Sequence, residues 1–115
     1  MPPVDPNMDI QNNVQLNWQV NWLPLGFKEV SSSRQTFLTK QVQEEVVESR
    51  LYSDGLATFT VYLRAEGDEA FDNQFAQQEK LTLFTHLIDN HEIVVIGDVP
   101  MQTAKRIAQS VVLPK

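Results

Sequence analysis

Residues 57–64 alternate between apolar and polar side chains, and this alternation constrains the fold more than any other stretch of the chain. Side chains of a β-strand point alternately to its two faces, so the apolar positions share one face. These positions are Ala57, Phe59, Val61 and Leu63. The opposite face is amphipathic. A strand of this kind must pack its apolar face on a second layer, which predicts a sheet with a covering layer.

Period-two patterns and turn residues predict further strands along the chain. The predicted strands lie over residues 16–20, 27–37, 42–52, 81–88 and 92–97. The predicted turns lie at Pro24–Gly26, at Ser53–Gly55, which suits a two-residue hairpin loop, and at Asp89–Asn90. The run Ile93–Ile96 is apolar on both faces and therefore predicts a central strand covered on both sides.

Helical periodicity follows the last strand. Pro100 suits a first helical position because its missing N–H has no partner there. An apolar stripe then runs through Met101, Ala104, Ile107, Ala108 and Val111, before Leu113 and Pro114 end the helix. A second, short helix is predicted over residues 70–77. The fold class is therefore α+β, an antiparallel sheet of about five to six strands with a C-terminal helix packed on one face.

The length of 115 residues suits one domain. Residues 1–14 contain three prolines and several Asp and Asn residues without periodicity, so we expect an extended or disordered linker there and the folded domain over residues 15–115. The tail has the composition of an interdomain linker, which suggests that the sequence is part of a longer protein. No stretch approaches the roughly 20 apolar residues of a membrane-spanning helix.

Charge and composition exclude several kinds of function. The net charge is −6 and the nine Lys and Arg residues are scattered, which argues against binding to nucleic acid. There is no cysteine, so disulfides and thiolate chemistry are excluded. No glycine-rich phosphate loop is present. We therefore expect no cofactor.

The candidate catalytic groups lack the context that catalysis needs. His86 and His91 are the only histidines, and a metal site would require acidic neighbours such as Asp89 and Glu92 to converge with them. The serines at 31–33 lack the G-x-S-x-G context of a nucleophile. The histidines are more simply turn or surface residues and the serines strand residues. The chain is therefore not predicted to be an enzyme.

Five motifs occur in an order that resembles the C-terminal domain of the RseB/MucB family. They are W-L-P-x-G-F at 22–27, S-S-S-R at 31–34, E-S-R-L-Y-S-D-G-L at 48–56, N-x-E-I-x-x-x-G-x-x-P at 90–100 and T-A-K-R-I-A-x-S at 103–110. The resemblance extends from Trp18 to Val112. Glu79, where a glycine is expected, and the acidic stretch 40–45 depart from it.

The resemblance implies a periplasmic regulator of a Gram-negative bacterium. Such proteins bind the periplasmic domain of an RseA/MucA-type anti-sigma factor and shield it from a site-1 protease of the DegS type, which keeps sigma-E envelope-stress signalling off. Their own N-terminal domain, absent from this chain, resembles the lipoprotein carrier LolA. An alternative function is therefore a lipid- or lipoprotein-binding element, which would require an apolar cavity between sheet and helix. A homo-oligomer is a further possibility, since the face for the missing domain would be apolar.

The expected partner-binding residues were inferred from chemistry and expected exposure. Arginine offers a planar set of donors to a carboxylate or backbone, and exposed aromatic residues anchor interfaces. The expected set is Trp22, Phe27, Ser32, Ser33, Arg34, Arg50 and Tyr52. For Trp22 and Phe27, as for Trp18, packing in the core is the competing interpretation.

Overall fold

The computed structural model describes residues 8–38, 44–65 and 81–114. The elements are β1 (Met8–Asn12), β2 (Gln19–Val20), β3 (Lys28–Leu38), β4 (Glu44–Ser53), β5 (Thr58–Ala65), β6 (Thr82–Ile88), β7 (His91–Gly97), α1 (Met101–Gln109) and β8 (Val111–Val112). Six strands form one antiparallel sheet in the order β1-β3-β4-β5-β7-β6, and β2 pairs with β8. The predicted α+β class, with its C-terminal helix, is confirmed.

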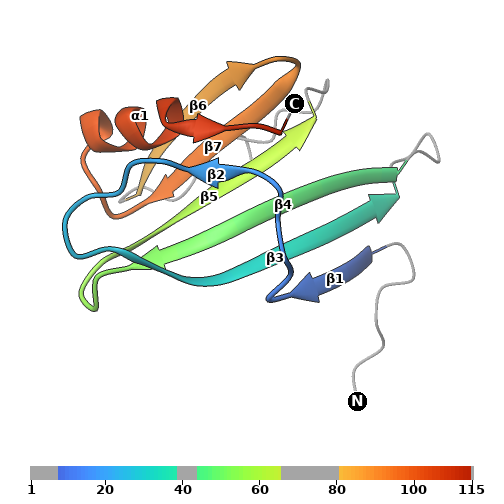
Figure 1. Cartoon of the computed structure of the whole chain (residues 1–115), viewed down its shortest axis with the longest axis horizontal. Coiled ribbons are helices and arrows are strands. Elements are labelled where there is room, and N and C mark those ends of the chain that lie inside the picture. Colours follow the sequence, from blue (N-terminus) through green and yellow to red (C-terminus); the bar gives the residue numbers. More distant parts are fainter. Residues whose placement is uncertain (1–7, 39–43, 66–80, 115) are drawn as a thin grey trace.

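The molecule has two layers (Figure 1). The six-stranded sheet forms one layer. The other contains α1, which packs on β6 and β7, and the short β2–β8 ribbon beside it. Between the layers lies one cluster of buried side chains, drawn from β4, β5, β7, α1, β8 and the segments before β2 and α1. Its largest fully buried members include Trp18, Phe59, Ile93 and Ile107.

The strands β5 and β7 form the centre of the core. Phe59, Val61 and Leu63 of β5 are buried, as the alternation predicted. β7 lies between β5 and β6, and the run Ile93–Ile96 is buried on both of its faces. On the opposite, amphipathic face of β5, Arg64 is only 4% exposed and forms an ion pair with buried Glu92. The amphipathic pattern did not predict this burial.

Two hairpin turns carry the expected residues in different geometries. Asp89 and Asn90 form a two-residue loop in which both φ angles are positive, a conformation that Asn and Asp tolerate. The loop between β4 and β5 has four residues rather than the two predicted. The carboxylate of Asp54 accepts hydrogen bonds from the backbone N–H groups of Leu56 and Ala57, and these bonds stabilise the wider loop.

The N-terminal part of the chain differs from the sequence prediction. Within the predicted linker, Met8–Asn12 form β1, which pairs with β3. At Asn13, where φ is +57°, the chain leaves the sheet edge and crosses its face towards β2 (Figure 1). The predicted strand over residues 16–20 is wrong except for Gln19–Val20.

The C-terminal helix begins after Pro100, which is its N-cap, and ends at Gln109. Ala104, Ile107 and Ala108 are buried as the stripe predicted, whereas Met101 is exposed. Val111 lies in β8 and not in the helix, because the chain turns at Ser110 to pair with β2. No helix in the described part of the chain has the length and apolar character needed to cross a bilayer. The predicted helix over residues 70–77 lies outside the described residues.

Candidate functional site

The pairing of β3 with β4 positions most of the expected binding residues. Ser32 lies opposite Arg50 and Arg34 lies opposite Glu48, so these side chains share one face of the sheet. This is the face crossed by the segment that leads from β1 to β2. Ser33 lies on the other face, where its hydroxyl is 2.7 Å from that of Ser49. The expected set is therefore divided between two faces.

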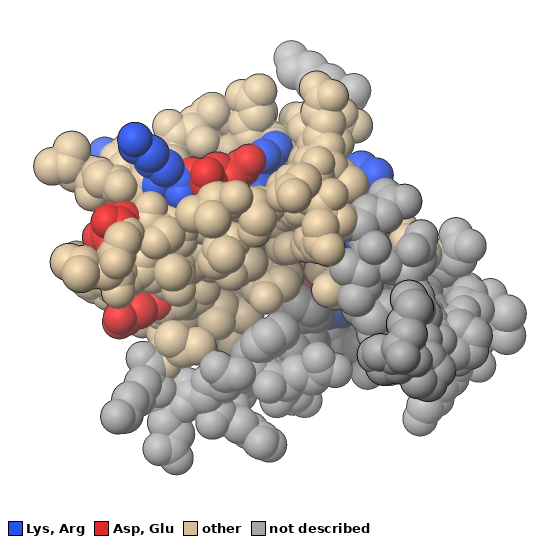
Figure 2. All heavy atoms as spheres, turned by 90° about the horizontal axis from the view of Figure 1, so that it is seen from below, with Lys and Arg blue, Asp and Glu red and all other residues tan. Residues whose placement is uncertain are grey.

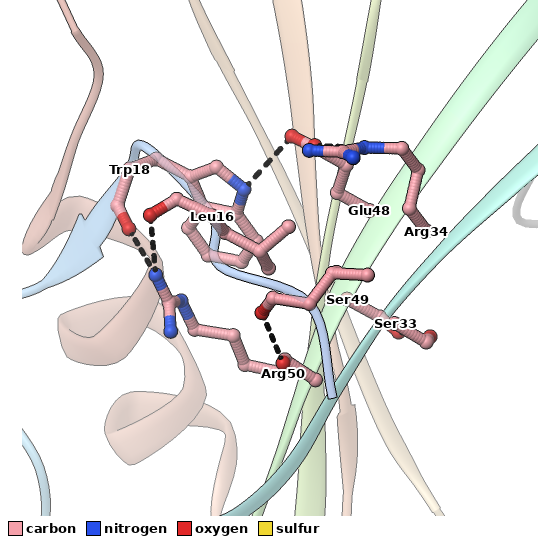
Figure 3. A network of polar contacts seen from close by, with 9 residues as sticks. Leu16, Trp18, Ser33, Arg34, Glu48, Ser49 and Arg50 are labelled. Carbon is pink, nitrogen blue, oxygen red and sulfur yellow. Dashed lines mark hydrogen bonds and ion pairs between the residues drawn. The ribbon is translucent and has the colours of Figure 1, made fainter. Parts of the chain in front are cut away.

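Arg50 holds the crossing segment on the sheet (Figure 3). Its Nη2 donates hydrogen bonds to the backbone carbonyl oxygens of Leu16 and Trp18. Its Nη1 pairs with the Glu29 carboxylate, and its guanidinium lies 4.8 Å from the centre of a Trp18 ring. Arg50 thus satisfies internal carbonyl groups. Because its side chain is only 14% exposed, it offers little surface to a partner.

Glu48 joins the crossing segment to β3 on the same face (Figure 3). Its Oε1 accepts a hydrogen bond of 3.1 Å from the Trp18 indole N–H. Its Oε2 pairs with Nε of Arg34 at 2.9 Å. The side chain of Arg34 remains 34% exposed, so part of this side chain is accessible to another molecule. We call Trp18, Arg34, Glu48 and Arg50 the Arg–Glu cluster.

Three other expected residues are mainly structural in this chain. Tyr52 is 3% exposed and stacks on Phe59 with ring centres 5.0 Å apart, and Phe27 packs against the same ring at 5.0 Å. The Ser32 hydroxyl donates a hydrogen bond of 2.6 Å to the backbone carbonyl of Val14. These internal contacts are sufficient to explain why Tyr52, Phe27 and Ser32 occur in the sequence motifs, and no contact with a partner is needed for that.

Burial also changes the acidity of Tyr52. Desolvation raises the pKa of its hydroxyl from 10.0 to about 12, and the positive charge of Arg50 offsets this in part. Below pH 10 both the folded and the unfolded chain keep the proton. Between pH 10 and about 12 the unfolded chain loses it first, so stability is lost as the pH rises.

We expect Tyr52→Phe to reduce this alkaline loss of stability, because phenylalanine keeps the ring stacking but does not ionise. Urea unfolding of both proteins at pH 8 and pH 11.5 measures the effect. The difference in stability between the two pH values should be smaller in the variant. Equal losses in the two proteins would show that Tyr52 ionises in the folded chain as readily as in water.

Trp22 lies apart from the Arg–Glu cluster, against α1 and its C-terminal end. Its ring lies 4.2 Å from the Arg106 guanidinium carbon, and its backbone N–H donates to the Ser110 hydroxyl. Trp22 is half-buried and packs against the core. It therefore contributes to core packing and also keeps surface that a partner could contact. The structure thus brings together Ser32, Arg34, Arg50 and Tyr52, and places Ser33 and Trp22 elsewhere.

A pocket adjoins the Arg–Glu cluster, and the sequence did not predict it. It has a volume of about 190 Å³ and is lined by Asn17, Trp18, Glu48, Leu63, Asp89, His91, Leu113 and Pro114. Its residues come from five separate segments, which explains why no motif marks it. The alternation of Leu16 and Trp18 with exposed Asn17 indicated only which side of the segment is buried.

Charged side chains are interspersed on the visible surface. In Figure 2, Lys and Arg side chains lie beside Asp and Glu side chains, and the described residues form no extended basic area on that face. Within residues 8–38, 44–65 and 81–114, no three His, Asp or Glu side chains are grouped so that they could hold a metal ion.

Comparison with curated proteins finds relatives among regulators. The Sigma-E factor regulatory protein RseB of Escherichia coli (strain K12) is 44% identical over 89 residues, which are 77% of this chain and 27% of RseB. RseB of Haemophilus influenzae is 35% identical over 89 residues, again 77% of this chain and 27% of RseB. The chain thus spans about a quarter of the length of these relatives.

Solved structures of MucB share the fold. MucB in complex with MucA(peri) matches with a TM-score of 0.60 and 24% identity, over 89% of this chain and 38% of that chain. MucB alone matches with a TM-score of 0.55 and 25% identity, over 87% of this chain and 34% of that chain. The MucB/RseB C-terminal domain profile matches residues 12–112, nearly the whole sequence. The chain therefore belongs to the MucB/RseB C-terminal domain family.

Proposed function

We propose that this chain is a protein-binding regulatory domain that helps to hold the periplasmic region of a MucA/RseA-type anti-sigma factor. The observation that carries the proposal is the family match over residues 12–112, together with relatives that are sigma-E factor regulatory proteins. The structure of MucB in complex with MucA(peri) supports the same partner class. In this proposal the domain acts in the periplasm beside a LolA-like N-terminal domain.

Binding alone is sufficient for this function. A bound segment that is sterically covered is inaccessible to a site-1 protease, so no covalent step is required and we propose no enzymatic activity. Release would follow when a ligand elsewhere in the longer protein shifts the arrangement of its domains. The alternative of a lipid-binding element requires an apolar cavity between the layers, and that space contains the contiguous cluster of buried side chains.

We place the contact surface at the exposed edge of the Arg–Glu cluster. The partly exposed side chain of Arg34 lies there, and the half-buried Trp22 adds a second contact beside α1. Arg50, Tyr52, Ser32 and Phe27 would act by fixing this surface rather than by filling it. Ser33 would contribute only from the opposite face.

Calorimetric titration with the purified periplasmic region of the anti-sigma factor tests this proposal. We expect saturable binding that weakens about tenfold or more in Arg34→Ala, tenfold being the lower end of the roughly 1.5–3 kcal/mol of a charge-assisted hydrogen bond. Lys105→Ala, which removes an exposed cation from α1, is the matched control and should bind normally. Circular dichroism confirms that each variant is folded.

Two outcomes would count against the proposal. Absence of binding by the folded chain would show that this domain does not recognise the partner by itself. Equal weakening in Arg34→Ala and Lys105→Ala would show that only net charge matters and that the contact surface is placed wrongly.

A further inference from the structure

The pocket beside the Arg–Glu cluster has walls of two kinds. Leu63, Leu113 and Pro114 provide apolar surface, and the Trp18 indole adds an aromatic edge. Glu48, Asp89, His91 and Asn17 provide polar groups. A pocket that combines apolar walls with a few polar groups suits a ligand whose stem is apolar and whose head is polar.

The charged and ionisable groups in this pocket are hydrogen-bond acceptors. Glu48 and Asp89 are carboxylates, and the described lining residues include no lysine or arginine. Nδ1 of His91 lies 2.9 Å from the backbone carbonyl oxygen of Asp89. A carbonyl oxygen only accepts, so Nδ1 carries the proton in this contact, and Nε2 of a neutral ring would be an acceptor. The two carboxylates therefore favour a ligand whose head donates hydrogen bonds and carries positive charge.

The size of the pocket limits the ligand to one side chain. A volume of about 190 Å³ is below the 300–1,000 Å³ of pockets that hold whole small molecules. Lysine and arginine combine a methylene stem with a head that has donors and no acceptor. The net charge of −6 favours their approach.

We propose that this pocket receives a basic side chain, arginine or lysine, from the peptide segment that the domain binds. The methylene stem packs on Leu63, Leu113 and Pro114, and the charged head lies between the carboxylates of Glu48 and Asp89. The pocket thus gives specificity for a basic residue in the partner. The biological role rests on the proposed function, whereas the side-chain specificity can be tested without the partner.

Nuclear magnetic resonance with small probes tests the pocket directly. The two tryptophans give two indole N–H signals, and Trp18 is assigned by its retention in Trp22→Phe. The ¹⁵N-labelled chain is titrated with the acetylated amides of arginine, lysine and citrulline, the last being the neutral counterpart of arginine. We expect a saturable shift of the Trp18 signal with a basic probe and about tenfold weaker binding of citrulline.

A pair of matched variants locates the binding. Asp89→Asn removes one carboxylate from the pocket and keeps a residue that tolerates the positive φ of this turn. Asp98→Asn removes another exposed carboxylate, which does not line the pocket. Arginine should bind about threefold to tenfold more weakly to Asp89→Asn and unchanged to Asp98→Asn. Glu48 is kept because its loss would also release Trp18 and Arg34.

The possible results separate cleanly. A stronger response to arginine than to lysine, or the reverse, supports the proposal and identifies the preferred residue. Equal binding of arginine and citrulline, no response of Trp18 to either basic probe, or equal effects of the two variants would overturn it. Each of those results would leave the calorimetric test of partner binding unaffected.

Discussion

Gly97→Ala is expected to destabilise the fold by about 3 kcal/mol or more, at the upper end of what overpacking costs. Gly97 ends β7 and pairs directly with Phe59 of β5. A Cβ atom at Gly97 would overlap the Cα and Cβ atoms of Phe59 and would lie 2.6 Å from the carbonyl oxygen of Thr58. These atoms belong to a central strand, so they cannot move aside as the tip of a flexible side chain could. Chemical denaturation measures the effect.

Gly55→Ala provides the comparison for this prediction. Gly55 has a φ of +95°, but a Cβ atom there would meet nothing within 4 Å. Its substitution carries only the conformational cost of about 1–2 kcal/mol. Gly97→Ala should therefore cost more than Gly55→Ala. The opposite order would show that β5 and β7 can separate locally at little cost.

Glu92→Leu is the second change with a large expected effect, again about 3 kcal/mol or more. The Glu92 carboxylate accepts from Nε of Arg64 at 3.2 Å and from Nη2 at 3.0 Å. The Glu92 side chain is 11% exposed and the Arg64 side chain is 4% exposed. Removing this carboxylate takes away both hydrogen bonds and the negative charge that Glu92 supplies to the buried guanidinium. Urea unfolding at neutral pH measures the loss.

Glu29→Leu is the control for the buried pair. Glu29 also pairs with an arginine of the sheet, but the Glu29 side chain is 40% exposed, and Arg50 keeps its hydrogen bonds to the carbonyl groups of Leu16 and Trp18. Exposed ion pairs contribute roughly 0–1 kcal/mol, so this substitution should have a small effect. Similar losses in Glu29→Leu and Glu92→Leu would mean that water reaches Arg64 in the folded protein.

The sequence predicted the regular part of the fold because period-two alternation and turn residues are local signals. The strand around Phe59, the hairpin at Asp89–Asn90 and the C-terminal helix were predicted for this reason. The segment around Trp18 was predicted as a strand because its alternation reports burial. Burial there comes from a crossing over the sheet, where Arg50 binds the carbonyl groups that a neighbouring strand would otherwise bind.

The candidate site was only partly predictable. Ser32 and Tyr52 look like surface residues in sequence, but a crossing segment and an aromatic stack bury them. Glu48 is not among the expected binding residues, yet it links Trp18 to Arg34. These roles depend on contacts between residues far apart in sequence, so neither spacing nor composition could indicate them. The binding residues remain a prediction, which the proposed titrations test.

The β2–β8 ribbon has a consequence for how the protein is made. Val20 pairs with Val111, so this ribbon closes a loop of nearly the whole chain, and such long-range pairing is slow to form. A chain synthesised from its N-terminus can form the β3–β4–β5 hairpins early. It cannot cover Trp18 and the rest of the core until the residues of α1 and β8 are available. Polypeptides that end before Val111 should therefore stay incompletely folded and be open to degradation.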